Sequence, residues 1–188
     1  MTRTRLSASA LLGAALLLTG CGYNTMQSLD EQINQAQGQI QTQLQRRADL
    51  VPNLVSTVKG ITKQEDTVFI SIANARAKLS GAVQARDVEG MAAANDQLSA
   101  GLGRLLAISE NYPELRSSEN FKELQDQLEG TENRIAVART DYNTAVGQFN
   151  AYVRRFPYNL TAKVFGLDKP RPYFQAQAGA AEPPKVQF

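Results

Sequence analysis

The chain has 188 residues, a net charge of +2 and 43% hydrophobic residues, which is enough for one domain with a core of its own. It has no His and a single Cys, which excludes Ser-His-Asp and Cys-His catalysis, His-ligated zinc, internal disulfides and iron–sulfur clusters held by this chain alone. The small net charge argues against nucleic acid as a partner.

Residues 1–20 are predicted to be a signal peptide. Arg3 and Arg5 precede the 13-residue run 6–18 of Leu, Ala, Ser and Gly, which is too short to span a ~30 Å hydrocarbon core. Removal of Arg3 and Arg5 reduces the 20 basic residues to 18, equal to the 18 acidic residues. The mature chain is therefore expected to carry no net side-chain charge.

Residues 18–21, Leu-Thr-Gly-Cys, resemble the lipobox of bacterial lipoproteins. In such proteins the cysteine thiol receives a diacylglycerol, the signal is cut before it, and the new amine is acylated, for example with palmitate. The resemblance implies that Cys21 is the lipid attachment site. Gly22, in place of Asp, implies the outer membrane rather than the inner one, with the domain in the periplasm. An ordinary signal peptide with an incidental cysteine is the alternative.

The mature chain is predicted to be all-α. It is rich in Ala, Gln, Leu, Glu and Arg and lacks β-branched runs of period two. The first apolar seam covers 26–50, the second 54–82 and the third 88–109. We expect a turn at Gly81–Asp87 with Asp87 as N-cap, and a close helix contact at 101–103. At Pro52 a helix break is favoured, and one long kinked helix is the alternative.

The fourth seam, from Phe121 to Phe156, is the most regular. Its apolar residues are spaced alternately by three and four for five heptads, which predicts one long helix packed nearly parallel to its neighbours. Ser117 or Ser118 is the expected N-cap, and Pro157 marks the end. Since no helix hides its apolar stripe alone, we predict an antiparallel four-helix bundle with long coiled-coil-like helices over 21–167. A flexible Pro/Ala/Gln-rich tail follows at 168–188, where Tyr173, Phe174 and Phe188 either dock or do nothing specific.

Two stretches, 45–55 (Gln-Arg-Arg-Ala-Asp-Leu-Val-Pro-Asn-Leu-Val) and 110–115 (Glu-Asn-Tyr-Pro-Glu-Leu), resemble the signature of the LemA family. The resemblance extends over roughly residues 23–175. It implies a helical bundle tethered to a membrane by its N-terminus, with no established enzymatic activity and roles in membrane organisation or assembly. Many members carry His-Glu where this chain has Gln64-Glu65, so a metal role for that pair is not supported.

Arg47 and Glu65 occupy seam positions that favour apolar side chains. Unpaired buried charges are strongly unfavourable, so we consider three interpretations. The two residues pair across helices with Asn53 nearby, they reach solvent individually, or Glu65 acts as an acid or base in a cleft. The last lacks a second carboxylate or a His. Asn95 and Thr131 are interpreted as residues that fix helix register.

The sequence thus favours a non-enzymatic lipoprotein that acts as a scaffold or adaptor at the bacterial envelope. We expect no catalytic residues, no metal and no cofactor. The expected partners are membrane lipid through acylated Cys21, membrane or envelope proteins, and copies of the chain itself. The alternative is an envelope enzyme or small-ligand carrier that uses a cavity in the bundle, which would require several polar groups at one level of the core.

Overall fold

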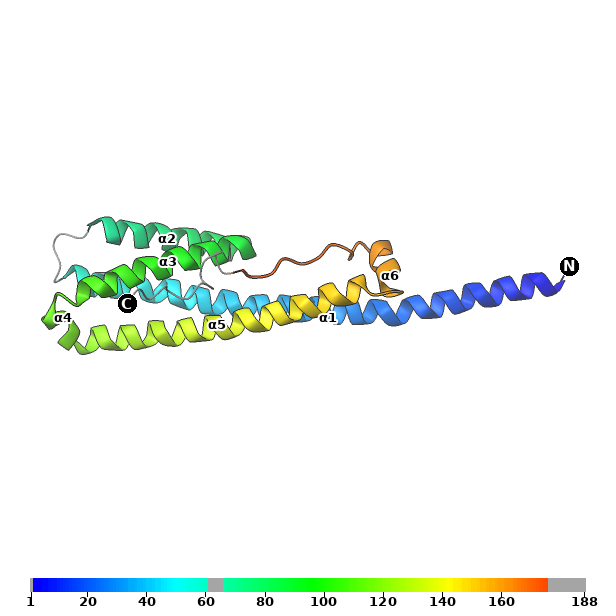
Figure 1. Ribbon diagram of the computed structural model, residues 1–188, viewed down its shortest axis with the longest axis horizontal. Helices are drawn as coiled ribbons and strands as arrows, with labels where there is room; N and C mark the ends of the chain where they lie inside the picture. The colour runs from blue at the N-terminus through cyan, green and yellow to red at the C-terminus, as the bar shows by residue number, and fades with distance from the viewer. Residues whose placement is uncertain (1, 61–65, 176–188) are drawn as a thin grey trace, which may run out of the picture. The chain divides into compact units, whose positions relative to one another are not determined.

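A computed structural model describes residues 2–60 and 66–175, with side chains from residue 22 onward. Over these residues the chain is all-helical and forms no strand, which confirms the all-α prediction. The six helices are α1 (Thr2–Lys59), α2 (Asp66–Ala85), α3 (Val88–Ser109), α4 (Pro113–Ser117), α5 (Glu119–Arg154) and α6 (Tyr158–Val164) (Figure 1). The fold divides into unit 1, Met1–Gln37 with Asp141–Pro172, and unit 2, Gly38–Thr140 with Tyr173–Phe188.

The core of unit 2 is built from apolar residues of α1, α2, α3 and α5. Many side chains at the predicted seam positions are fully or almost fully buried, among them Ile40, Leu54, Ile72, Leu79, Met91, Leu98, Leu105, Phe121 and Ile135. At Gly101 the helices α2 and α3 come close, because a Cβ there would lie 2.9 Å from Ile72 Cγ1. Gly103 has open space around it, so only the first glycine of the predicted close contact takes part.

The turn between α2 and α3 is shorter than predicted. Helix α2 continues through Gly81 to Ala85, and only Arg86 and Asp87 separate it from α3. Arg86 adopts a positive φ of 55°, and the amide of Asp87 donates to the carbonyl of Ala82, which ends the helix as a C-terminal cap does. The carboxylate of Asp87 accepts from the Gly90 amide at 3.0 Å, so the predicted N-cap is confirmed.

The helix break favoured at Pro52 is wrong. Helix α1 runs through Pro52 to Lys59, so Leu54 and Val58, assigned to a second helix, belong to the first. A proline inside a helix leaves the carbonyl four residues earlier without its amide partner. Here that carbonyl belongs to the buried Ala48, and it accepts a hydrogen bond of 2.7 Å from Arg76 Nε of α2. The guanidinium replaces the missing backbone donor, which lets the helix continue.

Arg76 is therefore expected to stabilise the chain more when position 52 is proline than when it is alanine. Arg76→Met should lower the free energy of unfolding by about 1–3 kcal/mol, because it leaves the Ala48 carbonyl buried without a donor. In a Pro52→Ala background the restored amide supplies that donor, so the same change should cost about 1 kcal/mol less. Urea unfolding of the four proteins measures the coupling. Lys78→Met, which removes an exposed bond to Gln97, is the matched control. Equal costs of Arg76→Met in both backgrounds would contradict this account.

Helix α5 is one uninterrupted helix, as the fourth seam predicted. It begins at Glu119, directly after Ser118, whose carbonyl accepts from the Lys122 amide at 3.2 Å. The seam residues are buried from Phe121 to Phe149 with few exceptions, but its last member, Phe156, is 75% exposed. Phe156 lies beyond the end of the helix at Arg154, so the period that positions the earlier residues no longer applies to it.

Unit 1 is formed by the N-terminal part of α1, the C-terminal part of α5, and α6 with the segment after it. Its buried residues include Met26, Ile33, Tyr142, Ala145, Val146, Phe149, Val153 and Ala162. Neither α6 nor the five-residue α4 is predicted from the sequence, because both helices are too short to show an apolar period. Tyr152 and Tyr158 stack with ring centroids 4.5 Å apart and thereby join α5 to α6.

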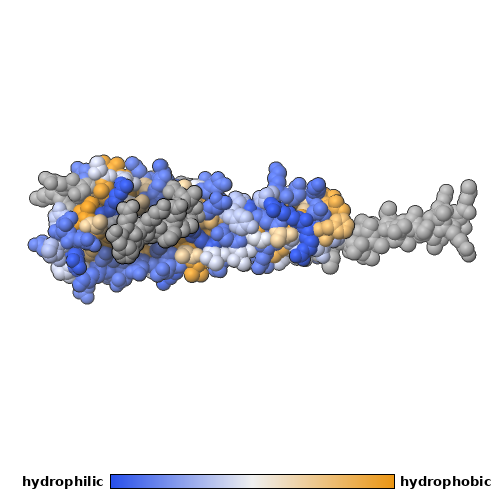
Figure 2. All heavy atoms as spheres, in the orientation of Figure 1, coloured by the Kyte–Doolittle hydropathy of each residue, from blue (hydrophilic) through white to orange (hydrophobic). Residues whose placement is uncertain are grey.

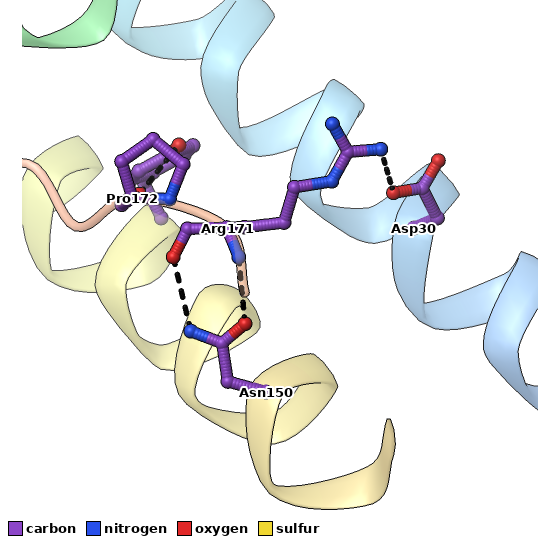
Figure 3. Close-up of polar contacts among 5 residues, drawn as sticks. Asp30, Asn150, Arg171 and Pro172 are labelled. Atoms are coloured by element: carbon purple, nitrogen blue, oxygen red, sulfur yellow. Dashed lines mark hydrogen bonds and ion pairs between the residues drawn. The ribbon is translucent and has the colours of Figure 1, made fainter. Parts of the chain in front are cut away.

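Residues 168–175, predicted to begin a flexible tail, pack against the helices instead. Asn150 Oδ1 of α5 accepts a hydrogen bond from the Arg171 amide at 2.8 Å, and Asn150 Nδ2 donates to the Arg171 carbonyl at 3.0 Å (Figure 3). The side chain thus pairs with the backbone as a neighbouring strand would. Tyr142 Oη donates to the Pro172 carbonyl at 3.0 Å. Within unit 2, Phe174 is buried and lies 4.9 Å from the Arg139 guanidinium. Phe174 therefore docks, whereas Phe188 lies outside the described residues.

Candidate functional site

The predicted lipid attachment residue, Cys21, lies within α1, and its side chain is outside the described part of the structure. The residue that follows, Gly22, is packed. Gly22 is buried, and a Cβ there would lie 2.7 Å from Tyr158 Cδ1, which requires glycine or a shift of the ring. Tyr23 packs on Phe165 with ring centroids 4.5 Å apart. Unit 1 is thus closed around the two residues that follow Cys21.

Arg47 is the charged residue at the centre of unit 2. It is 5% exposed, and its Nη1 donates to Asn95 Oδ1 of α3 at 2.7 Å. The same nitrogen forms an ion pair with the carboxylate of Glu132 on α5, whose side chain is 44% exposed. Arg47 Nε is also buried and has no hydrogen-bond partner within the described residues. The cluster connects α1, α3 and α5.

Burial lowers the pKa of the Arg47 guanidinium, while Glu132 and Asp96 raise it. These opposed effects leave a paired cation in a largely dry setting, which is the usual arrangement of a structural ion pair. Thr131, also buried, donates to the Leu128 carbonyl one turn earlier at 2.7 Å. The hydrogen-bond donor of the Thr131 hydroxyl is therefore satisfied within α5.

The other two predicted polar core residues are Asn53 and Glu65. Asn53 is exposed on α1, and its carbonyl accepts bonds from Ser56 and Thr57. Glu65, predicted as the partner of Arg47, lies outside the described residues. Sequence reasoning missed Glu132 as the partner because it stands beside the seam residue Thr131 and not on the seam. Asn95, a polar residue on a seam, is the signal in the sequence that could have pointed to this contact.

A surface groove runs along α1 beside the Arg47 cluster. It has a volume of about 700 Å³, and its lining comes from α1 and the end of α2, namely Gln41, Thr42, Gln45, Arg46, Asp49, Leu50, Asn53 and Val83. Gln45 donates to Asp49 at 2.9 Å, and Gln41 donates to the Val83 carbonyl at 3.4 Å. The groove holds one arginine and one carboxylate. It offers polar contacts along a helix face and no pair of carboxylates for acid–base chemistry.

In unit 1 polar side chains bind the segment that follows α6. Arg171 pairs with Asp30 of α1 at 2.6 Å while its backbone is held by Asn150 of α5 (Figure 3). Burial raises the pKa of Tyr142, and Arg171 lowers it. A neutral Tyr142 hydroxyl is required as the donor to the Pro172 carbonyl, so the direction set by burial preserves this bond.

Among the described side chains, at 22–60 and 66–175, no three His, Cys, Asp or Glu residues gather in a way that would hold a metal ion. None of the helices that the structure describes combines the length and the apolar character needed to cross a membrane.

Comparison with known proteins decides the family. The LemA family model matches residues 36–188, which includes the 45–55 stretch and most of the described helices. The chain belongs to the LemA family. The signature residues Gln45, Arg46, Asp49 and Asn53 line the groove, whereas Arg47 of the same stretch is buried in the polar cluster. One LemA signature thus contributes to both a surface and a core contact.

Three magnetosome proteins are similar to this LemA chain. MamQ 1 and MamQ 2 of Paramagnetospirillum magneticum are each 26% identical over 184 residues, covering 86% of this chain and 67% of the relative. MamQ of Magnetospirillum gryphiswaldense is 22% identical over 180 residues, covering 84% of this chain and 66% of the relative. The chain therefore spans about two thirds of the length of these relatives.

Proposed function

We propose that this LemA protein is a lipoprotein that acts as a non-enzymatic scaffold or adaptor at the bacterial envelope. The observation that carries the proposal is the junction at Cys21. Gly22 and Tyr23, the two residues after Cys21, pack against Tyr158 and Phe165. An acyl group on Cys21 would hold this packed unit at the membrane with no spacer. Diacylglycerol and palmitate together supply the two or more chains that stable anchoring needs.

The part that would make contacts is an antiparallel four-helix bundle in unit 2. Side-chain bonds join α1 to α2 through Arg76, α1 to α3 through Asn95, and α1 to α5 through Glu132. Helices α2 and α3 form a hairpin across the Arg86–Asp87 turn. These contacts, with apolar seams spaced by three and four residues, support coiled-coil-like packing around one core.

The groove on α1 supports action by contact with another protein. Its exposed polar side chains sit on one helix face, which suits a partner helix or an extended segment better than an enclosed small ligand. We infer that the partners are membrane or envelope proteins, or further copies of the chain, and that nucleic acid is not among them. The MamQ relatives are named for the magnetosome and not for a reaction, which agrees with this class of function.

Gly22 supports the outer membrane as the location, with the helical units in the periplasm. The lipid anchor confines the protein near that surface and raises its effective concentration for neighbours there. Weak contacts through the groove then suffice, and no acid, base or nucleophile is needed.

The anchor is tested with Cys21→Ala. We expect the variant to lose palmitate labelling and to leave the membrane fraction or to retain residues 1–20, because the thiol that receives the diacylglycerol is gone. Mass spectrometry of the wild-type protein checks the attachment directly. A free Cys21 thiol in protein purified from membranes would reject the lipoprotein proposal.

The scaffold role is tested in a strain in which loss of the gene has a phenotype. Isosteric variants such as Asp49→Asn and Tyr142→Phe should retain activity, whereas Cys21→Ala should lose it. If one folded and anchored isosteric variant abolishes function while the unanchored protein retains it, the enzyme or ligand-carrier alternative replaces the scaffold.

A further inference from the structure

An apolar patch covers the α6 end of unit 1 (Figure 2). Its members are Phe156, Leu160, Val164 and Phe165, which are 75%, 56%, 80% and 52% exposed. Phe156, Leu160 and Val164 are spaced four residues apart, so Leu160 and Val164 share one face of α6. Thr161 and Ala162 are buried and face the core. Large apolar residues gathered at one end of a unit mark a site of interaction with a protein or a membrane.

The patch adjoins the residues that directly follow Cys21, the predicted lipid attachment site. Tyr158 of α6 closes over Gly22, and Phe165 at the end of α6 packs on Tyr23. Because there is no spacer between Cys21 and these contacts, acyl chains on Cys21 would place the neighbouring α6 at the level of the lipid headgroups. A patch at that level meets lipid before it meets any protein partner.

Charge around the patch also suits a lipid surface. Arg154, Arg155, Lys163 and Lys169 are all exposed, and Asp168 is the one acidic residue between positions 150 and 170. The mature chain as a whole has no net side-chain charge, so this basic group is a local feature. Basic residues beside exposed apolar residues are the combination that interfacial helices use to bind membranes containing anionic lipid.

We propose that α6 and Phe156 form a second membrane contact, in which Phe156, Leu160, Val164 and Phe165 enter the headgroup region of the anchoring bilayer. This inference rests on the proposed lipid anchor at Cys21. The anchor supplies attachment, and the patch fixes the orientation of unit 1 against the surface. An interfacial element of this kind buries its apolar face to a depth of about 5–10 Å.

The absence of Trp from the chain makes a direct test available, since one introduced tryptophan is the sole indole reporter. The full-length, processed Val164→Trp variant is reconstituted in phosphatidylethanolamine/phosphatidylglycerol vesicles with brominated acyl chains. We expect its emission to shift to shorter wavelength and to be quenched about twofold or more relative to unbrominated vesicles, as for a side chain at the acyl boundary. Phe156→Trp, which keeps an aromatic residue, is the second reporter and should respond alike.

Val137→Trp is the matched control, because Val137 is a 62% exposed valine on α5 outside the patch. Its quenching should stay near zero in the same vesicles. Quenching of both patch reporters no greater than that of Val137→Trp, in vesicles that carry the protein, would overturn the proposal. A blue shift of Val164→Trp in detergent without vesicles, together with a dimer mass in ultracentrifugation, would assign the patch to a second copy and also overturn it.

The outcome separates this contact from the anchor. If mass spectrometry shows a free Cys21 thiol and Val164→Trp is still quenched by brominated vesicles, the patch binds lipid and the lipoprotein proposal fails. If Cys21 is acylated and the patch reporters stay unquenched, the anchor stands and the second membrane contact is wrong.

Discussion

Replacing Ile135 with aspartate is expected to lower the free energy of unfolding by about 4 kcal/mol or more. Ile135 is 0% exposed and lies in the middle of the α5 seam, within unit 2. A carboxylate there loses its hydration, and the apolar contacts of the isoleucine are lost as well. For a chain of this length the midpoint of thermal unfolding should fall by roughly 10 °C.

The adjacent control is Val137→Asp. Val137 is 62% exposed two residues along the same helix, so its aspartate stays in water and should change the midpoint by no more than about 2 °C. Circular dichroism melts of both variants and the parent protein provide the comparison. An unchanged midpoint for Ile135→Asp would show that the α5 seam does not form the core, and it would contradict the packing of unit 2.

The contrast between α5 and Pro52 shows how far the sequence predicts this fold. Helix α5 follows from local information alone, because its apolar residues recur every three or four positions over its whole length. Pro52 carries an equally clear local signal, which favours a break. The signal is overridden by Arg76, a residue 24 positions away that supplies the missing donor to Ala48. Sequence period cannot reveal a compensation that exists only once α1 and α2 have packed.

The candidate site follows the same division. That Arg47 needs a partner could be inferred from its seam position, because a buried cation without one is strongly unfavourable. Which residue provides the partner could not, since Glu132 is partly exposed and has no distinctive place in the α5 period. Residues 168–188 have no apolar period, which predicts a flexible tail. In residues 168–175 the backbone at Arg171 and Pro172 is held by Asn150 and Tyr142, and a composition of Pro, Ala and Gln does not disclose these bonds.

The Arg47 cluster yields the second large expected effect. Arg47→Met replaces a buried cation by an apolar side chain of similar length, and it leaves the Asn95 oxygen, which is buried, without its donor. We expect it to lower the free energy of unfolding by about 2–3 kcal/mol. Glu132 can turn toward water, since its side chain is 44% exposed, so its lost pairing adds little.

Removing both buried polar partners should cost less than the sum of the single changes. In Arg47→Met/Asn95→Leu no unsatisfied polar atom remains from this pair. The free-energy cost of burying the guanidinium is also removed, and its Nε has no hydrogen-bond partner in the described chain. We therefore expect a coupling free energy of about 1–2 kcal/mol in a double-mutant cycle measured by urea unfolding.

Arg46→Met is the control, because Arg46 is the neighbouring arginine and is exposed in the groove. It should couple to Asn95→Leu by less than about 0.5 kcal/mol. A cycle in which Arg47 and Asn95 behave as independently as Arg46 and Asn95 would mean that Arg47 reaches solvent in solution and does not fix the register of α1, α3 and α5.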